Sequence, residues 1–206
     1  MSVSKAEVID LATMDHLQNV QERMQQMSFD HLPLAAQPKA KKTIRLLKDC
    51  FRQVEKETNK ALDLGKIEDA LPPFKRCVSP SDFGFHNAIR TADGVKFFDF
   101  EFGGWDDPAK TAVDFILQPK VPVREGISLP LRVISRIEQE AFLKRTEILQ
   151  PILKIKWFCI IGGFLGKLRY SQLMTIVPDA EMHRFIVGKL DKIIRAIEEE
   201  VEHGVH

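Results

Sequence analysis

Apolar residues recur at helical spacing in the first and last thirds of the chain and predict a mainly helical protein. A capping-box pattern at residues 4–7 predicts a first helix. The apolar phase slips after about Thr13 and restarts, which predicts a bend followed by a further helix with the face Leu17, Val20, Met24 and Met27. A second long helix is predicted from Lys39 to just before Gly65. The last helix is predicted to open at Pro178, because proline and acidic residues suit a helix start. Its apolar stripe consists of Ile186, Leu190, Ile193, Ile197 and Val201.

The middle of the chain changes to a pattern rich in phenylalanine and turn residues. Residues 87–90 and 95–98 are predicted as two short strands, joined as a hairpin by residues 91–94 with their Asp-Gly pair. Pro108 is predicted to start a helix, with an inner face of Val113, Phe115, Ile116 and Leu117. Two further helices are predicted, one opening at Ser128 and Pro130 and ending near Leu149, the other over residues 151–175.

The net charge, the length of the apolar runs and the cysteines indicate which partners and which cellular compartment to expect. The 206 residues carry a net charge of +1, which gives no basic footprint for nucleic acid. The most apolar run, residues 157–165, is far short of the roughly 20 residues that cross a bilayer, and residues 1–15 lack a signal-peptide pattern. Cys50, Cys77 and Cys159 are odd in number and include no Cys-x-x-Cys pair. We therefore expect reduced thiols in a cytoplasmic protein, with neither nucleic acid nor membrane as partner.

Residues 77–115 carry a polar constellation that suits phosphoryl transfer. Asp82 lies in a predicted loop, Asn87 follows five residues later, and Asp99 ends the second strand of the hairpin. Phosphoryl transfer needs a carboxylate that accepts or orients the proton of the attacking hydroxyl, and hard oxygens that hold Mg²⁺. An Asp-x4-Asn loop with a returning hairpin brings these groups together. The structural alternative is that these aspartates only form turns and helix caps.

The segment resembles the aminoglycoside phosphotransferase and choline-kinase-like family, a branch of the protein-kinase-like fold. The matching stretches are SDFGFHN at 81–87, FDFE at 98–101 and WDDP at 105–108, followed by Asp114. The resemblance implies one C-terminal lobe over residues 1–206, of mainly α (α+β) class, with helices around a small β-hairpin that carries the catalytic loop. Residues 1–75 would be its helical leading part, 76–117 its catalytic and metal-binding segment, and 128–206 its helical substrate side.

The resemblance also implies a role for each matching position. Asp82 would be the catalytic base or hydroxyl-orienting group, while Asn87 and Asp99 would be Mg²⁺ ligands. Asp107 and Asp114 would be structural, capping a helix or bracing the catalytic loop.

Two further residues are weaker candidates for contact with the substrate. They are Glu101 and His86, of which His86 could instead pack or hydrogen-bond locally. Pro80 replaces the histidine that braces the loop in the family. The acidic residues Glu101, Asp106 and Asp107 would weakly favour a cationic acceptor.

A complete enzyme of this family also needs a β lobe, with a Gly-rich loop over the phosphates of ATP and a lysine on a strand. The first glycine is Gly65, and residues 1–64 have a helical pattern, so we expect the N-terminal ATP lobe to be absent. The expected function is transfer of the ATP γ-phosphate to a hydroxyl of a small molecule, such as a sugar, an aminoglycoside-like compound or an amino alcohol. This chain alone is expected to be inactive or incomplete and to bind ATP poorly.

Two other functional readings remain open from the sequence. One is a non-catalytic, pseudokinase-like binding module, and the other is a helical interaction protein unrelated to kinases. A missing N-terminal lobe or a second copy of the chain is the expected partner. Either would cover an apolar face, expected at Leu11, Leu17 and Val20 or around residues 83–85.

Overall fold

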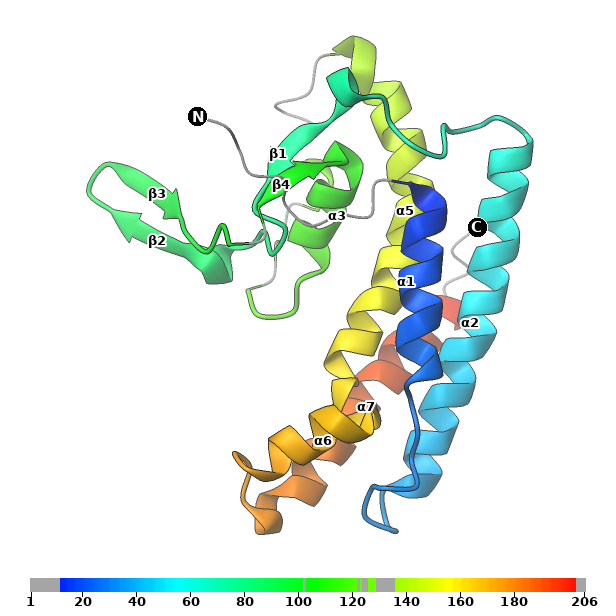
Figure 1. Cartoon of the computed structure of the whole chain (residues 1–206), viewed down its shortest axis with the longest axis vertical. Helices are drawn as coiled ribbons and strands as arrows, with labels where there is room; N and C mark the ends of the chain where they lie inside the picture. The colour runs from blue at the N-terminus through cyan, green and yellow to red at the C-terminus, as the bar shows by residue number, and fades with distance from the viewer. Residues whose placement is uncertain (1–11, 102, 122, 124–125, 129–135, 203–206) are drawn as a thin grey trace. The chain divides into compact units, whose positions relative to one another are not determined.

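The computed structural model describes residues 12–101, 103–121, 123, 126–128 and 136–202 (Figure 1). The chain divides into two compact units, each built from two segments: residues up to 17 with 56–154, and residues 18–55 with those from 155 onward. The prediction of a mainly helical protein is confirmed, and two small antiparallel sheets accompany the helices. The sequence predicted a single lobe over residues 1–206, and the two units are described separately below.

The predicted helices that start near Thr13, Lys39, Pro108 and Pro178 are confirmed to within a few residues. The helices are α1 (Thr13–Gln25), α2 (Gln37–Asp63), α3 (Pro108–Leu117), α5 (Arg136–Ile161), α6 (Lys167–Met174) and α7 (Asp179–Glu202). The helix predicted from the capping box at residues 4–7 lies outside the described residues, as does the start predicted at Pro130.

The prediction of a helix break before Pro151 is wrong, because α5 continues through that proline. Proline inside a helix costs about 3 kcal/mol through a lost hydrogen bond and a steric clash. Leu149, Ile152 and Leu153 are fully buried beside it. Burying each such side chain contributes about 1.5–3 kcal/mol, so packing outweighs the proline.

The prediction of one helix over residues 151–175 is also wrong, because α5 ends at Ile161 and α6 begins at Lys167. Glycine is poor in helices, and Gly162, Gly163 and Gly166 fall in the gap. The Leu165 carbonyl accepts from the Ser28 N–H at 2.8 Å instead of continuing a helix. A contact distant in sequence therefore ends the helical pattern here.

An aliphatic core holds together the unit of residues 18–55 and 155 onward. Ile186, Leu190, Ile193 and Ile197 are buried, which confirms the predicted stripe of α7 as far as it is described. Ile186 and Leu190 belong to one buried apolar cluster with residues from α2, from the segments before α2 and α6, and from the start of α7, namely Leu32, Ala36, Ala40, Ile44, Phe164, Leu165 and Met182.

Both sheets lie in the other unit. The predicted hairpin is confirmed as β2 (Ala88–Thr91) and β3 (Gly94–Phe97), in which Thr91 pairs with Gly94. Gly94 has a φ of 122°, which favours glycine at this turn. Figure 1 shows the hairpin as an arm extending away from α3. The sequence analysis missed a second antiparallel pair, β1 (Cys77–Ser79) with β4 (Gly104–Asp106).

The three cysteines are free thiols, and burial raises the pKa of each. For Cys159 burial raises the pKa to about 12, so its thiolate is scarce near neutral pH. These thiols therefore lack the activation that nucleophilic catalysis needs. No helix in the described ranges combines the length and apolar character that crossing a bilayer requires.

Candidate catalytic loop and metal site

The candidate catalytic loop starts where β1 ends, at Ser79. The Ser81 N–H donates to Ser79 Oγ at 3.2 Å, and the Asp82 N–H donates to the Pro80 carbonyl at 2.9 Å. Ser81 has a φ of 69°, in the left-handed region that non-glycine residues seldom adopt. A tight turn held by these bonds therefore brings the chain to Asp82.

Three of the residues expected at the site lie together. The His86 Nε2 is 3.1 Å from Asp82 Oδ2. The side-chain Nδ2 of Asn87 donates to the Asp82 carbonyl at 3.0 Å and to Asp82 Oδ2 at 3.4 Å. The Asp82 side chain is 47% exposed, so a carboxylate with one fixed oxygen faces solvent. The local hydrogen bond expected as one alternative for His86 is therefore present, while its contact with a substrate stays a prediction.

Aromatic side chains anchor this loop to the elements around it. Phe83 packs on Phe97 of β3 and Phe115 of α3, with ring centroids 4.8 Å and 4.9 Å apart. Phe85 contacts the same two rings at 6.2 Å and 5.0 Å. Such pairs contribute about 0.5–1.5 kcal/mol each beyond their buried area. The loop that carries Asp82 is thus held by the hairpin and by α3 at once.

A backbone hydrogen bond at the base of the β2–β3 hairpin joins the segments that carry the two expected metal ligands, Asn87 and Asp99. The Phe98 N–H donates to the Asn87 carbonyl at 3.0 Å, and Asp99 follows directly. Asp99 has a φ of 66°; with Ser81, it is one of two described non-glycine residues with a positive φ. The side chains of Asp99 and Glu101 are exposed, and neither makes a hydrogen bond or ion pair with another described residue.

The donor set of Asn87 and Asp99 fits Mg²⁺. Because Nδ2 of Asn87 is turned toward Asp82, its amide oxygen is the atom that remains for a cation. An amide oxygen and a carboxylate are the hard ligands that Mg²⁺ prefers. Within the described ranges, no three His, Cys, Asp or Glu side chains converge as a metal site. A cation held by these two residues would therefore take its other ligands from water or a substrate.

Asp107 caps a helix, which is one of the two structural roles that the resemblance implied for it. It is the N-cap of α3 and accepts from the Ala109 N–H at 2.7 Å. Its other oxygen accepts from Nε of Arg145, a buried residue of α5. Arg145 also donates to the carbonyls of Glu68 and Asp69. One guanidinium thus connects the start of α3 with α5 and with the segment after α2.

A second buried ion cluster joins the end of β4 to α3. Lys110 Nζ is 2.6 Å from Asp106 Oδ2 and 3.4 Å from Asp114 Oδ2, and all three side chains are buried. Burial opposes the charged form of Lys110, but the carboxylates of Asp114 and Asp106 together raise its pKa above the ordinary value. The expectation that Asp106 and Asp107 would favour a cationic acceptor is therefore wrong, because both are buried and already paired.

Sequence reasoning missed both cations of these clusters. Lys110 lies four residues from Asp106 and from Asp114, a helical spacing that could have revealed the cluster. No such signal exists for Arg145, because its partners lie 38 to 77 residues away in the sequence.

The apolar face expected at Leu17 and Val20 is not exposed: these residues are 3% and 1% accessible. Leu11 lies outside the described residues. In the other expected region, residues 83–85, Phe85 is 39% exposed, while Phe83 is half-buried and Gly84 is buried. Several large apolar residues near Phe85 in the sequence are also exposed, namely Val78, Ile89, Val95, Phe98, Phe100 and Trp105.

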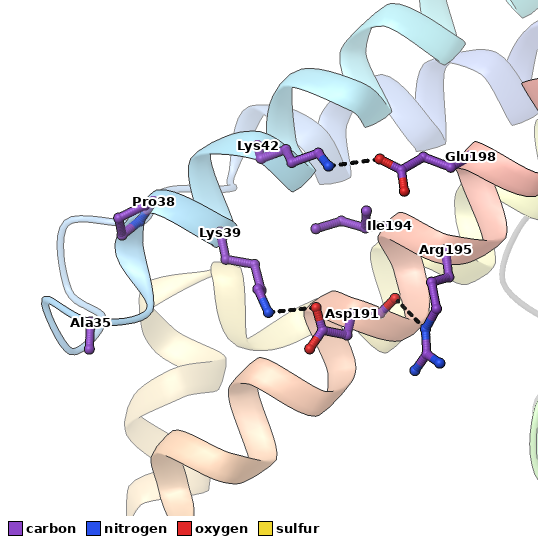
Figure 2. Close-up of a pocket in the computed structure, with 8 residues that line it drawn as sticks. All are labelled: Ala35, Pro38, Lys39, Lys42, Asp191, Ile194, Arg195 and Glu198. Carbon is purple, nitrogen blue, oxygen red and sulfur yellow. Dashed lines mark hydrogen bonds and ion pairs between the residues drawn. The ribbon is translucent and has the colours of Figure 1, made fainter.

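The unit that lacks the candidate site contains a groove between α2 and α7 (Figure 2). Figure 2 shows Lys39 pointing toward Asp191 and Lys42 pointing toward Glu198. The ion pairs measure 2.6 Å from Lys39 Nζ to Asp191 Oδ1 and 2.7 Å from Lys42 Nζ to Glu198 Oε1. Each lysine is thus already matched by an acid across the groove. This arrangement stabilises the helix pair and offers no unmatched charge from these four residues.

Comparisons of this chain with models of protein families, with curated proteins and with solved structures gave no significant match.

Proposed function

We propose that this chain is a phosphotransferase similar to the C-terminal lobe of the aminoglycoside phosphotransferase and choline-kinase-like family. It would transfer the γ-phosphate of ATP to a hydroxyl of a small molecule, such as a sugar, an aminoglycoside-like compound or an amino alcohol. The observation that carries the proposal is the half-exposed Asp82 carboxylate, one oxygen of which is held by His86 and Asn87. A carboxylate fixed on one side and open on the other suits a group that receives a proton.

In the proposed reaction, Asp82 orients the acceptor hydroxyl and accepts its proton as the oxygen attacks phosphorus. Asn87 and Asp99 hold Mg²⁺, which neutralises charge on the phosphates when it is bound. The left-handed backbone at Ser81 and Asp99 supports this assignment. Such strained positions cluster at functional sites, where the surrounding structure maintains them.

The direct test is phosphate transfer from [γ-³²P]ATP by the full chain, against a panel of sugars, aminoglycosides and amino alcohols. Asp82→Ala is expected to lower turnover by about 10²–10⁴-fold, the usual contribution of a positioned general base. Asp93→Ala is the matched control, because Asp93 is an exposed carboxylate in the β2–β3 turn and should be silent. Unchanged turnover in Asp82→Ala would refute the assigned role.

A non-catalytic, pseudokinase-like module is the second candidate function. It is favoured by the sheets of the described residues, which have two strands each and include no Gly-rich strand pair for a nucleotide. On either reading, calorimetric titration of the chain with MgATP is expected to give a Kd weaker than micromolar. Micromolar binding would contradict the expected absence of an ATP-binding lobe. Weak binding combined with transfer to an acceptor at high ATP would favour the enzyme over the module.

A further inference from the structure

We propose that His86 is a positioning residue that fixes the orientation of the Asp82 carboxylate, and that Gly84 leaves the space its imidazole requires. The catalytic consequence of this inference rests on the proposed function. The contact itself is independent of that function and is tested separately.

His86 is enclosed, and its side chain makes one polar contact with the part of the chain that the structure describes. Its side chain is only 6% exposed, and Nε2 lies 3.1 Å from Asp82 Oδ2. Its other ring nitrogen, Nδ1, is buried and has no hydrogen-bond partner among the described residues. Buried polar atoms in proteins nearly always have a hydrogen-bond partner, so a buried imidazole with one unpaired nitrogen calls for an explanation. The bond from its other nitrogen to Asp82 provides that explanation.

The surroundings of the ring also determine which nitrogen carries hydrogen. A carboxylate oxygen only accepts, so Nε2 must be the donor in the bond to Asp82. A hydrogen on Nδ1 would be a buried donor without an acceptor, which is unfavourable. The geometry therefore points to the Nε2–H tautomer, with its hydrogen directed at Asp82.

The consequence for Asp82 is a defined orientation. Oδ2 receives both the His86 Nε2 at 3.1 Å and the Asn87 Nδ2 at 3.4 Å. Oδ1 is then the oxygen that can face an acceptor hydroxyl. Because a half-exposed carboxylate otherwise rotates freely, this bond reduces the conformations that must be lost before reaction.

Gly84 is required for space rather than for its backbone. Its φ of −179° is extended and accessible to any residue. A Cβ at this position would lie 2.6 Å from His86 Nδ1, 2.8 Å from His86 Cε1 and 3.0 Å from Gln118 Cγ. A single methyl group would therefore displace the ring from Asp82.

Nuclear magnetic resonance of the full chain labelled with ¹⁵N-histidine tests the contact at one fixed pH. We expect a solvent-protected ring Nε2–H signal from His86, beside one from His31, whose Nε2 lies 3.0 Å from the Phe164 carbonyl. The His86 signal is assigned by its disappearance in His86→Gln. Asp82→Ala and Gly84→Ala should each abolish or shift it. Gly188→Ala is the matched control, because an added methyl there meets nothing within 4 Å. An unchanged signal in Asp82→Ala, or a hydrogen on Nδ1, would overturn the inference.

Turnover separates positioning from simple packing. His86→Leu should lower kcat by about 10–10²-fold without changing the KM for ATP, while His86→Gln, whose amide can still donate, should recover most of it. Full kcat in His86→Leu would overturn the positioning role. If the unaltered chain transfers no phosphate, the proposed function fails, and the resonance experiment alone decides whether His86 holds Asp82.

Discussion

Replacing Arg145 by leucine is expected to lower the free energy of unfolding of the site-bearing unit, which consists of residues up to 17 and 56–154, by about 3–5 kcal/mol. The change leaves the buried Asp107 carboxylate without its cation, and the carbonyls of Glu68 and Asp69 without one donor. An unpaired buried charge costs far more than the ion pair contributes, which is why removing one partner is severe.

Urea unfolding measures this loss. Trp105 lies in the site-bearing unit and Trp157 in the other, so Trp105 fluorescence in a Trp157→Phe background reports on the relevant unit. Arg52→Leu is the control, because its ion pair with Asp49 is exposed and such pairs contribute little. Adding Asp107→Asn, which keeps the helix cap, should recover part of the loss. A change no larger than that of Arg52→Leu would show that the Arg145 network is not structural.

Replacing Lys110 by methionine is expected to cost about 3–5 kcal/mol as well, since Asp106 and Asp114 would then share a buried space without a cation. The loss should shrink as pH falls, because protonation removes the unpaired charges. Lys144→Met is the control, since its pair with Glu140 is fully exposed and should be silent. A loss independent of pH would contradict the electrostatic cause.

The unaltered protein should lose stability at high pH, where Lys110 loses its proton. The pKa of Lys110 is raised on folding above its ordinary value of 10.5. A raised folded pKa gives a contribution that is complete below 10.5 and is lost as pH rises through the folded pKa. Alkaline titration of unfolding should therefore show a loss above about pH 10.5 that is absent in Lys110→Met.

The sequence predicted those parts of the fold whose signals are local. The 3.6-residue stripe of Ile186, Leu190 and Ile193 identifies α7, because one helical face meets the core. The Asp-Gly pair identifies the β2–β3 hairpin, and Asp107-Pro108 identifies the start of α3. In each case a few adjacent residues determine the backbone.

The features that were missed depend on residues far apart in the chain. Strands β1 and β4 are three residues each, too short for an alternating pattern, and pairing joins Val78 to Trp105 across 27 positions. The route of α5 through Pro151 depends on burial rather than on propensity. Likewise, the contact of His86 with Asp82 follows from how the loop turns, and the spacing of the two residues alone does not reveal it.

The buried ions beside α3 give the site-bearing unit an unusual response to temperature. Hydration of charged groups becomes less favourable on warming, so the cost of burying Asp106, Asp107, Lys110 and Arg145 falls as temperature rises. Apolar burial, in contrast, weakens on cooling. Both effects act in the same direction in the cold. Below the temperature of maximum stability, the scaffold around Asp82 should therefore lose stability more steeply on cooling than a scaffold held by apolar burial alone.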